Sequence, residues 1–247
     1  MVGNWKMNPA TTAEAVTLAR LATTIDPGPV LIGVAPPAIA LPAVAEAIGT
    51  SHVKVFAQDV HWQASGAYTG QISAPMLTGL AYGTIVGHSE VRRDQGDDDA
   101  RVAAKATAAL RHDLFVIYCI GESLEQRTRG KTDRVIERQI RNGFATVDPG
   151  LLVVDGRYRF AIAYEPVWAI GTGVVATPAQ ASAAIAKVRE ELVRLGFGGE
   201  AVTIMYGGSV NAANCAECAG AEGVDGALVG GASLKPQEFT KIVSAFR

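Results

Sequence analysis

The sequence has few cysteines, no long apolar run and no marked excess of one charge. Three cysteines in 247 residues do not make a disulfide framework, so a reducing cytoplasm is the simplest compartment. No apolar stretch approaches the ~20 residues of a membrane-spanning helix, and the first residues lack the pattern of a signal peptide. A net charge of −2 gives no electrostatic footprint for nucleic acid or an acidic membrane. We therefore expect a cytoplasmic protein with neither nucleic acid nor membrane as a partner.

Signatures of bound metals and dinucleotides are also missing. The four histidines are scattered at positions 52, 61, 88 and 112, which is not the spacing of a metal site. No Gly-x-Gly-x-x-Gly motif follows the first expected strand, so a dinucleotide is not expected. Cys215 and Cys218 form a single CxxC, for which two incidental thiols on an alanine-rich helix are favoured over a redox or metal role. The expected reaction uses no cofactor and no metal.

Short apolar segments alternate along the chain with longer alanine-rich segments of helical character. The expected strands are residues 2–6, 30–34, 53–58, 82–86, 114–119, 160–164, 202–206 and 226–229. The expected helices are residues 12–24, 42–48, 74–80, 98–111, 131–144, 178–195, 212–219 and 236–246. Such alternation requires a parallel sheet, and eight repeats at this length indicate a closed α/β barrel of eight parallel strands, (β/α)8. No linker or shift in composition divides the chain, so residues 1–247 are expected to form a single catalytic domain.

The most informative segment is the ten residues that begin at Tyr164. It follows an expected buried strand and places Glu165 where a packed interior would exclude charge. Pro166 then ends strand pairing, and a small apolar body follows it as far as Gly171. A fixed carboxylate beside a movable flap suits a general base under a lid that excludes water. A structural glutamate beside an ordinary loop is the alternative.

Three reactive side chains follow expected strands, at the end of the barrel where such proteins place their chemistry. Lys6 closes the first strand, His88 follows the fourth and Glu165 follows the sixth. A carboxylate can remove a proton from carbon while an imidazole hydrogen-bonds the neighbouring carbonyl oxygen, as an enediolate forms. Lys6 would add positive charge for that oxygen and for a substrate phosphate. Each residue alone has a structural explanation, but the three together favour proton transfer.

Two glycine-rich turns, Gly207-Gly208-Ser209 and Gly230-Gly231, follow the seventh and eighth strands. Glycine lets backbone N–H groups approach an anion closely. A phosphate site after these two strands recurs in such barrels, completed by a short helix that would begin here at Ala232 and Ser233. Glycines needed only for tight turns are the alternative; the position of the two turns favours a phosphate site.

Six segments, spread from the first residues to the last, together resemble the triosephosphate isomerase family. They are Gly3 to Asn8, Gly66 to Gly70, Gly87 to Glu90, Tyr164 to Gly173, Tyr206 to Val210 and Asp225 to Leu234. The resemblance implies a TIM barrel. It also implies the interconversion of D-glyceraldehyde 3-phosphate and dihydroxyacetone phosphate through an enediol(ate), in glycolysis and gluconeogenesis, without a cofactor.

The same resemblance assigns roles to individual residues. Glu165 would be the catalytic base, His88 the neutral electrophile, and Lys6 and Asn4 substrate-binding groups. The segment from Pro166 to Thr172 would act as a closing lid. The implied phosphate donors are Gly171, Ser209, Gly230 and Gly231.

The family also implies a homodimer in which the third βα loop inserts near the partner's active site. Here that loop runs from Gln58 to Ile72, which is long for such a connection. It carries apolar side chains that would be unfavourable in water, namely Val60, Trp62, Ala64 and Tyr68. A loop packed on its own side chains is the alternative; we favour the interface.

Two departures from the family pattern leave the substrate open. Val91 stands where the family usually has an arginine that pairs with an acid, matched here by Asp97, and we expect packing of Val91 to replace that ion pair. The N-terminal segment is shorter than usual. Neither change touches the expected site residues. The alternatives are an isomerase of a four-carbon ketose phosphate (a tetrulose phosphate) and a barrel that binds a phosphorylated ligand without turnover.

Overall fold

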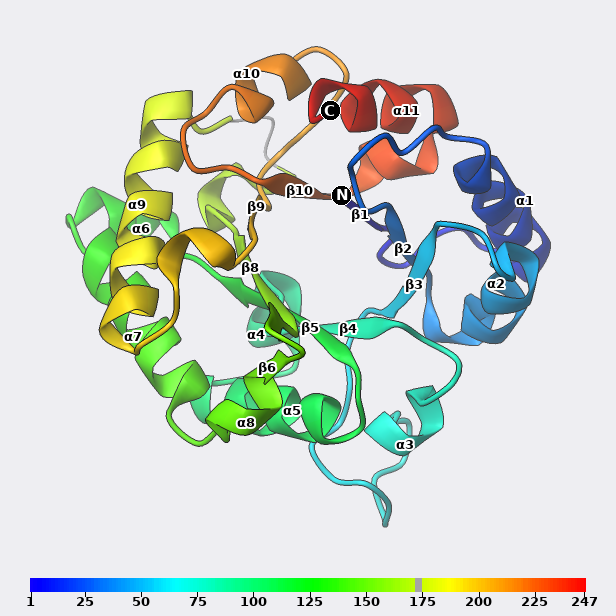
Figure 1. Cartoon of the computed structure of the whole chain (residues 1–247), viewed down its shortest axis with the longest axis horizontal. Helices are drawn as coiled ribbons and strands as arrows, with labels where there is room; N and C mark the ends of the chain where they lie inside the picture. Colours follow the sequence, from blue (N-terminus) through cyan, green and yellow to red (C-terminus); the bar gives the residue numbers. More distant parts are fainter. Residues whose placement is uncertain (172–174) are drawn as a thin grey trace.

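The computed structural model describes residues 1–171 and 175–247. Eight parallel strands close into a barrel in the order β1-β10-β9-β8-β5-β4-β3-β2. Helices surround this barrel on the outside (Figure 1). The barrel strands are β1 Val2–Asn4, β2 Gly33–Ala35, β3 Lys54–Ala57, β4 Gly83–Val86, β5 Phe115–Ile120, β8 Phe160–Tyr164, β9 Ile204–Tyr206 and β10 Gly226–Val229. The prediction of a (β/α)8 TIM barrel with eight parallel strands is confirmed.

Several of the surrounding helices begin at residues whose side chains accept hydrogen bonds from free backbone N–H groups. Thr11 and Thr177 each form a capping box, with Glu14 and Gln180 respectively, and Asp98 accepts from Arg101 N at 2.8 Å. The helices are α1 Thr12–Thr23, α2 Leu41–Ile48, α3 Ala74–Leu77, α4 Ser89–Asp94, α5 Asp99–Arg111, α6 Leu124–Thr128, α7 Thr132–Phe144, α8 Pro149–Leu152, α9 Pro178–Arg194, α10 Cys215–Ala219 and α11 Pro236–Ala245. No helix in the described ranges is both long and apolar enough to cross a membrane.

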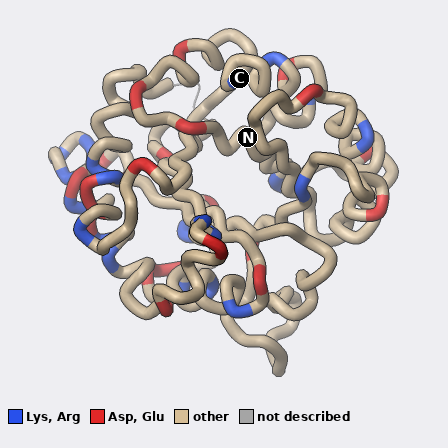
Figure 2. The backbone as a smooth tube through the Cα atoms, viewed as in Figure 1, with Lys and Arg blue, Asp and Glu red and all other residues tan. Residues whose placement is uncertain are grey.

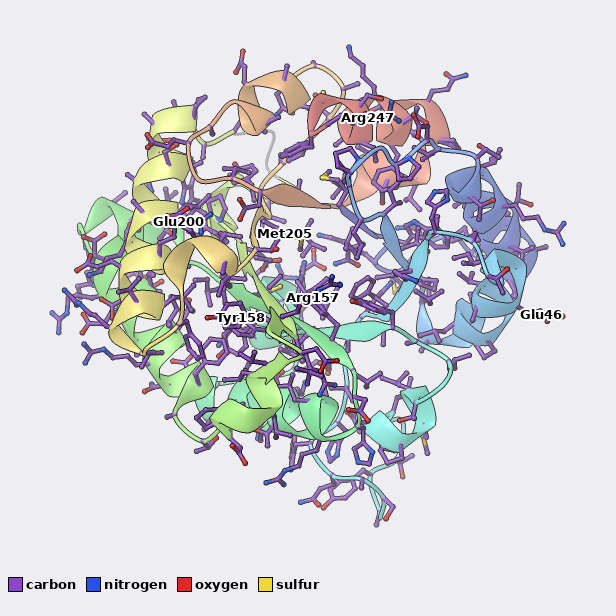
Figure 3. All side chains as sticks on the ribbon, in the orientation of Figure 1. Glu46, Arg157, Tyr158, Glu200, Met205 and Arg247 are labelled. Carbon is purple, nitrogen blue, oxygen red and sulfur yellow. The ribbon has the colours of Figure 1, made fainter. Side chains whose placement is uncertain are left out.

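Many of the charged residues lie on the outer helices (Figure 2), and apolar side chains fill the barrel. Figure 3 shows Met205 near the middle of the view, among the side chains that occupy the interior. Every barrel strand contributes to this inner cluster: Val2, Ala35, Phe56, Ile85, Ile117, Cys119, Ala163, Met205 and Leu228. The barrel is therefore a packed support rather than a pore, and polar chemistry is confined to its ends.

Several short elements differ from the sequence prediction. Helices α4, α6 and α8 were not expected, and neither was the hairpin of β6 Val153–Val154 and β7 Arg157–Tyr158. Each is too short for its periodicity to be recognised. The hairpin turn is Asp155-Gly156, with φ of 50° and 73°, as a two-residue turn requires. The first strand ends at Asn4 instead of Lys6, because Lys6 adopts a left-handed φ of 53°.

Candidate active site

A pocket of about 450 Å³ opens where the carboxyl ends of the strands meet the βα loops. All of the site residues expected from the sequence line this one pocket: Asn4, Lys6, His88, Glu165, Gly171, Ser209, Gly230 and Gly231. They come from the ends of five strands, β1, β4, β8, β9 and β10. The closed barrel therefore brings together side chains that are more than 200 residues apart in the sequence.

Glu165 follows β8 directly and is only 1% exposed. One carboxylate oxygen, Oε2, accepts a hydrogen bond from Ser89 N at 2.9 Å. The other, Oε1, lies 3.2 Å from His88 Nε2 but is not aligned for a hydrogen bond, and has no hydrogen-bond partner among the described residues. A buried carboxylate oxygen without a partner is costly, and such groups are concentrated at functional sites.

His88 is the N-cap residue of α4 and is 6% exposed. Its Nδ1 accepts a hydrogen bond from Glu90 N at 3.2 Å. A ring nitrogen that accepts a hydrogen bond carries no proton, so this contact assigns the proton of the neutral ring to Nε2. The Nε2–H group lies beside the Glu165 carboxylate, where it can donate to a ligand oxygen.

Lys6 lies beyond the end of β1 in the left-handed conformation, which is uncommon for a residue with a side chain. Its N–H donates to Asn4 Oδ1 at 3.1 Å, and its carbonyl accepts from Gln58 Nε2 at 2.8 Å. The ammonium forms an ion pair with Glu90 Oε1 at 2.5 Å. This backbone conformation and these contacts hold the lysine in the pocket. Sequence reasoning gave Glu90 and Ser89 no role, although both are in the His88 motif.

The glycine turns allow close approach of backbone to the site. A Cβ on Gly207 would lie 2.8 Å from Glu165 Cγ, whereas one on Gly231 would meet nothing within 4 Å. Gly231 begins the short helix Gly231–Leu234, so a helical turn follows β10 as expected. The hydroxyl of Ser209 donates to the carbonyl of Ala169 at 2.6 Å, which leaves its backbone N–H as the group available to an anion.

The segment after Glu165 is anchored at its start by Glu122, which is fully buried. The Glu122 carboxylate accepts from Trp168 Nε1 at 3.0 Å and from Tyr164 Oη at 3.0 Å, and it forms an ion pair with Arg127 at 3.0 Å. Burial, followed by the adjacent Glu122 charge, raises the pKa of Tyr164. Sequence reasoning gave Glu122 no role. Of the expected lid, Pro166 to Gly171 is described, whereas Thr172 lies outside the described residues.

The acid expected to lack its arginine is paired in another way. Asp97 forms an ion pair with Lys105 Nζ at 2.6 Å, and the same ammonium forms a second ion pair with Asp59 at 2.7 Å. The expectation that packing of Val91 replaces the missing ion pair is therefore wrong, because a buried lysine neutralises Asp97. Arg92, next in the chain, pairs with Asp99 at 2.8 Å.

The cysteines are all free. Burial and then the charge of Glu165 raise the pKa of Cys119 well above its usual value, and burial raises the pKa of Cys218 to about 11. Both thiols are therefore protonated near neutral pH, which opposes nucleophilic or metal-binding chemistry. No group of three possible metal-ligating side chains comes together within the described ranges.

The fold is a (β/α)8 barrel, and its pocket holds a carboxylate, an imidazole and an ammonium group. A family model described as triosephosphate isomerase matches residues 1–246, and the chain belongs to this family. The triosephosphate isomerase of Delftia acidovorans is 42% identical over 99% of this chain and 97% of its own length. That of Clostridium botulinum is 43% identical over 99% and 98%. These names give no support to the four-carbon alternative.

Proposed function

We propose that this protein interconverts D-glyceraldehyde 3-phosphate and dihydroxyacetone phosphate, with Glu165 as the base and His88 as a neutral hydrogen-bond donor. The proposal rests on one observation. In a single pocket, the buried Oε1 of Glu165 has no hydrogen-bond partner among the described residues and lies 3.2 Å from Nε2 of His88. The two groups supply the two requirements of the reaction, a proton acceptor beside carbon and a donor beside oxygen.

In the proposed mechanism, Glu165 takes a proton from the carbon next to the carbonyl, and the C–H electrons form the double bond of an enediolate. Negative charge develops on the carbonyl oxygen, where the Nε2–H of His88 and the ammonium of Lys6 stabilise it. His88 gives its Nε2 proton to that oxygen and takes the proton of the neighbouring hydroxyl, whose oxygen becomes the new carbonyl, while Glu165 returns its proton to the former carbonyl carbon. Oε1 is the oxygen suited to this task, because Oε2 is already held by Ser89.

The phosphate end of the pocket is proposed at the backbone of Gly171, Ser209, Gly230 and Gly231. Support comes from their position in the pocket wall and from the helical turn that starts at Gly231, whose N–H groups are directed away from the helix. Asn4 and Lys6 would contact the substrate between this end and the base. The described part of the lid, Pro166 to Gly171, would exclude water on closure.

The test is Glu165→Gln, which keeps the shape of the side chain and removes its basicity. We expect kcat to fall by roughly 10²–10⁴-fold or more with little change in KM, because only the transition state loses an interaction. Glu238→Gln is the matched control, since Glu238 lines the same pocket but pairs with Lys235 at 2.9 Å. Full turnover by Glu165→Gln, or an equal loss in the control, would refute the assignment of the base.

A homodimer formed through the loop from Gln58 to Ile72 is also proposed. The loop extends away from the barrel between β3 and α3 (Figure 1), and Tyr68 is half-exposed near its tip. Val60 is only 1% exposed, so it belongs to the chain's own core. Two large side chains after the neighbouring strands are more exposed: Met7 after β1 at 93% and Ile39 after β2 at 85%. Apolar groups exposed at the ends of three adjacent strands favour burial of this face against a second copy of the chain.

Sedimentation would test this assembly. We expect the native chain to sediment as a dimer, and Met7→Lys/Ile39→Lys to dissociate it, because two buried unpaired charges are unfavourable at an interface. Val193→Lys is the control, since Val193 is 59% exposed on α9. A monomeric native chain at micromolar concentration would contradict the proposal.

We also propose a single catalytic domain over residues 1–247 and a cytoplasmic location, the latter supported by three cysteines that form no disulfide.

A further inference from the structure

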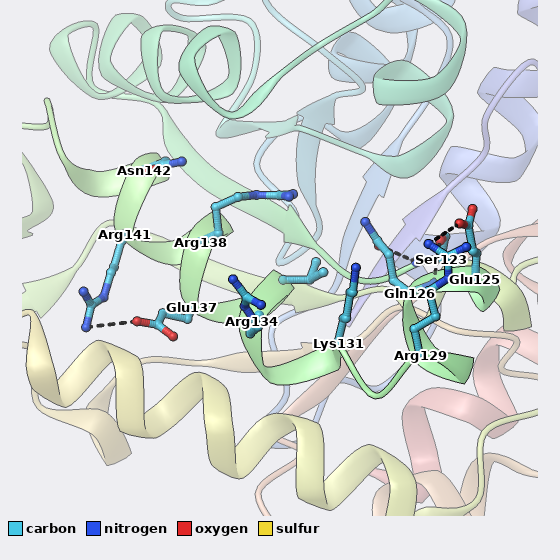
Figure 4. Close-up of a pocket in the computed structure, with 11 residues that line it drawn as sticks. Ser123, Glu125, Gln126, Arg129, Lys131, Arg134, Glu137, Arg138, Arg141 and Asn142 are labelled. Carbon is cyan, nitrogen blue, oxygen red and sulfur yellow. Dashed lines mark hydrogen bonds and ion pairs between the residues drawn. The ribbon is translucent and has the colours of Figure 1, made fainter.

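A second cavity, of about 730 Å³, lies outside the catalytic pocket and is larger than it. It is a groove between α6 and α7, on the outside of the barrel (Figure 4). Five cationic side chains line it: Arg129, Lys131, Arg134, Arg138 and Arg141. Only two acids, Glu125 and Glu137, do so. This excess of positive charge is local, because the whole chain carries a net charge of −2.

The two acids of the groove neutralise two of its cations. Glu125 pairs with Arg129 at 3.0 Å, and Glu137 pairs with Arg141 at 3.2 Å. Both pairs join residues four apart on one helix, so they are formed within α6 or α7 and its flanking residue. They leave the middle of the groove without a negative charge of its own.

The three remaining cations are uncompensated or only partly compensated. Lys131 and Arg134 have no acidic partner within 4 Å in the described part of the chain. Arg138 pairs with Asp99 at 2.9 Å, but Asp99 also pairs with Arg92 at 2.8 Å, so one carboxylate serves two guanidinium groups. Figure 4 shows Lys131 and Arg134 pointing to the same side of α7, between Gln126 and Arg138.

The neutral groups of the groove also favour an anion. Gln126 Oε1 is occupied by the N–H of Ser123 at 2.9 Å, so its NH₂ group is the part left for a ligand. Asn142 adds a second amide, and Val135 provides an apolar contact. The groove therefore presents mainly hydrogen-bond donors, and its volume is that of a small-molecule site rather than of a protein interface.

We propose that this groove binds a small anion carrying two or more phosphate groups, such as tripolyphosphate or the triphosphate of a nucleotide. Arginine guanidinium groups match phosphate oxygens in a bidentate geometry, and an ammonium adds a point charge. Two uncompensated cations, Lys131 and Arg134, and the partly compensated Arg138 favour a multiply charged ligand, because a single phosphate would leave positive charge unmatched. Binding here does not depend on the isomerase reaction.

The test is calorimetric titration of the native protein with tripolyphosphate, after 2-phosphoglycolate has saturated the catalytic pocket. We expect one further ion to bind per chain, with an affinity that falls as salt is added. Lys131→Gln/Arg134→Gln should weaken it by about five- to thirtyfold, as the loss of two exposed charge contacts would. Isomerase activity at the native level would show that the variant is folded.

Two comparisons separate a specific site from general charge. Arg20→Gln/Arg111→Gln removes the same charge from the ends of α1 and α5, and should bind tripolyphosphate like the native chain. Glu125→Gln frees Arg129 and should tighten binding by about two- to fivefold. No binding once the catalytic pocket is blocked, or equal weakening in both double variants, would overturn the proposal. Binding of ATP at least as tight as that of tripolyphosphate would support a nucleotide ligand; weaker binding of ATP would support a free polyphosphate.

Discussion

The replacement of Tyr164 by Phe tests whether the buried Glu122 carboxylate depends on its hydrogen bonds. Glu122 is fully buried and has three partners: the Tyr164 hydroxyl, the Trp168 indole and the Arg127 guanidinium. Tyr164→Phe removes one donor while the other two remain. The carboxylate stays buried, so the lost hydrogen bond is not regained from water.

The expected loss is that of a hydrogen bond to a charged group, about 1.5–3 kcal/mol in the free energy of unfolding. For 247 residues, unfolding entropy amounts to about 0.5 kcal/mol/K, so the melting temperature should fall by about 3–6 °C. Tyr118→Phe is the matched control. Tyr118 is also fully buried, but its hydroxyl makes a long 3.4 Å contact with the neutral carbonyl of Gln139. Its loss should cost no more than about 1 kcal/mol.

Both variants are compared with the native chain by urea unfolding at pH 7 and one fixed protein concentration, because any association would shift the midpoint. The slope with urea should be unchanged, so that the midpoints report stability alone. If Tyr118→Phe costs as much as Tyr164→Phe, the charge of the acceptor is not what matters. The reasoning about Glu122 would then be refuted.

Three further outcomes follow from burial and close contact. Burial raises the pKa values of Tyr164 and Tyr118, so their contribution to stability is complete below about pH 10 and is lost as the pH rises further. Urea midpoints should therefore fall as the pH rises from about 10 to 11, and constant midpoints over that range would contradict this. Gly207→Ala places a methyl 2.8 Å from Glu165 Cγ and should lower kcat by about 10²-fold by displacing the base, whereas an unchanged kcat would show that the base can adapt. Gly121→Ala places Cβ 1.7 Å from the Glu165 carbonyl oxygen and should destabilise the fold by more than about 3 kcal/mol, so a native urea midpoint would be inconsistent with this packing.

The alternation of strands and helices predicted the barrel because a parallel strand must be apolar on both faces and its helix must cover it. Helices of five or six residues, such as α6 and α4, were not predicted, because one or two turns of helix are too short to show a period in the sequence. The Asp155-Gly156 pair is a recognisable hairpin signal, and it was missed because the flanking strands have only two residues each.

The convergence of Lys6, His88 and Glu165 followed from topology, because successive strand ends meet at one face. Their supporting partners did not follow. Glu90 and Glu122 are acids at strand or helix ends, a position where most acids face solvent. Nothing in sequence spacing shows that Glu122 is buried or that Glu90 pairs with Lys6. Contacts across the barrel, such as that between Lys6 and Glu90, depend on side-chain directions that only the closed barrel defines.

The glycines at the mouth show most clearly what a sequence leaves open. A glycine at position 121 or 207 could be needed for a turn with positive φ, or for the close approach of another group to the backbone. Only the first explanation requires a positive φ. Neither residue has a positive φ, so conformational freedom is not the reason for either. Both are adjacent to Glu165 instead: a Cβ at Gly121 would overlap its carbonyl oxygen, and one at Gly207 would press on its Cγ. The position of Glu165 is thus set by two missing side chains just past the ends of the neighbouring strands, because β5 and β9 flank β8. The carboxylate proposed as the base fits here only because the barrel leaves room for it on both sides.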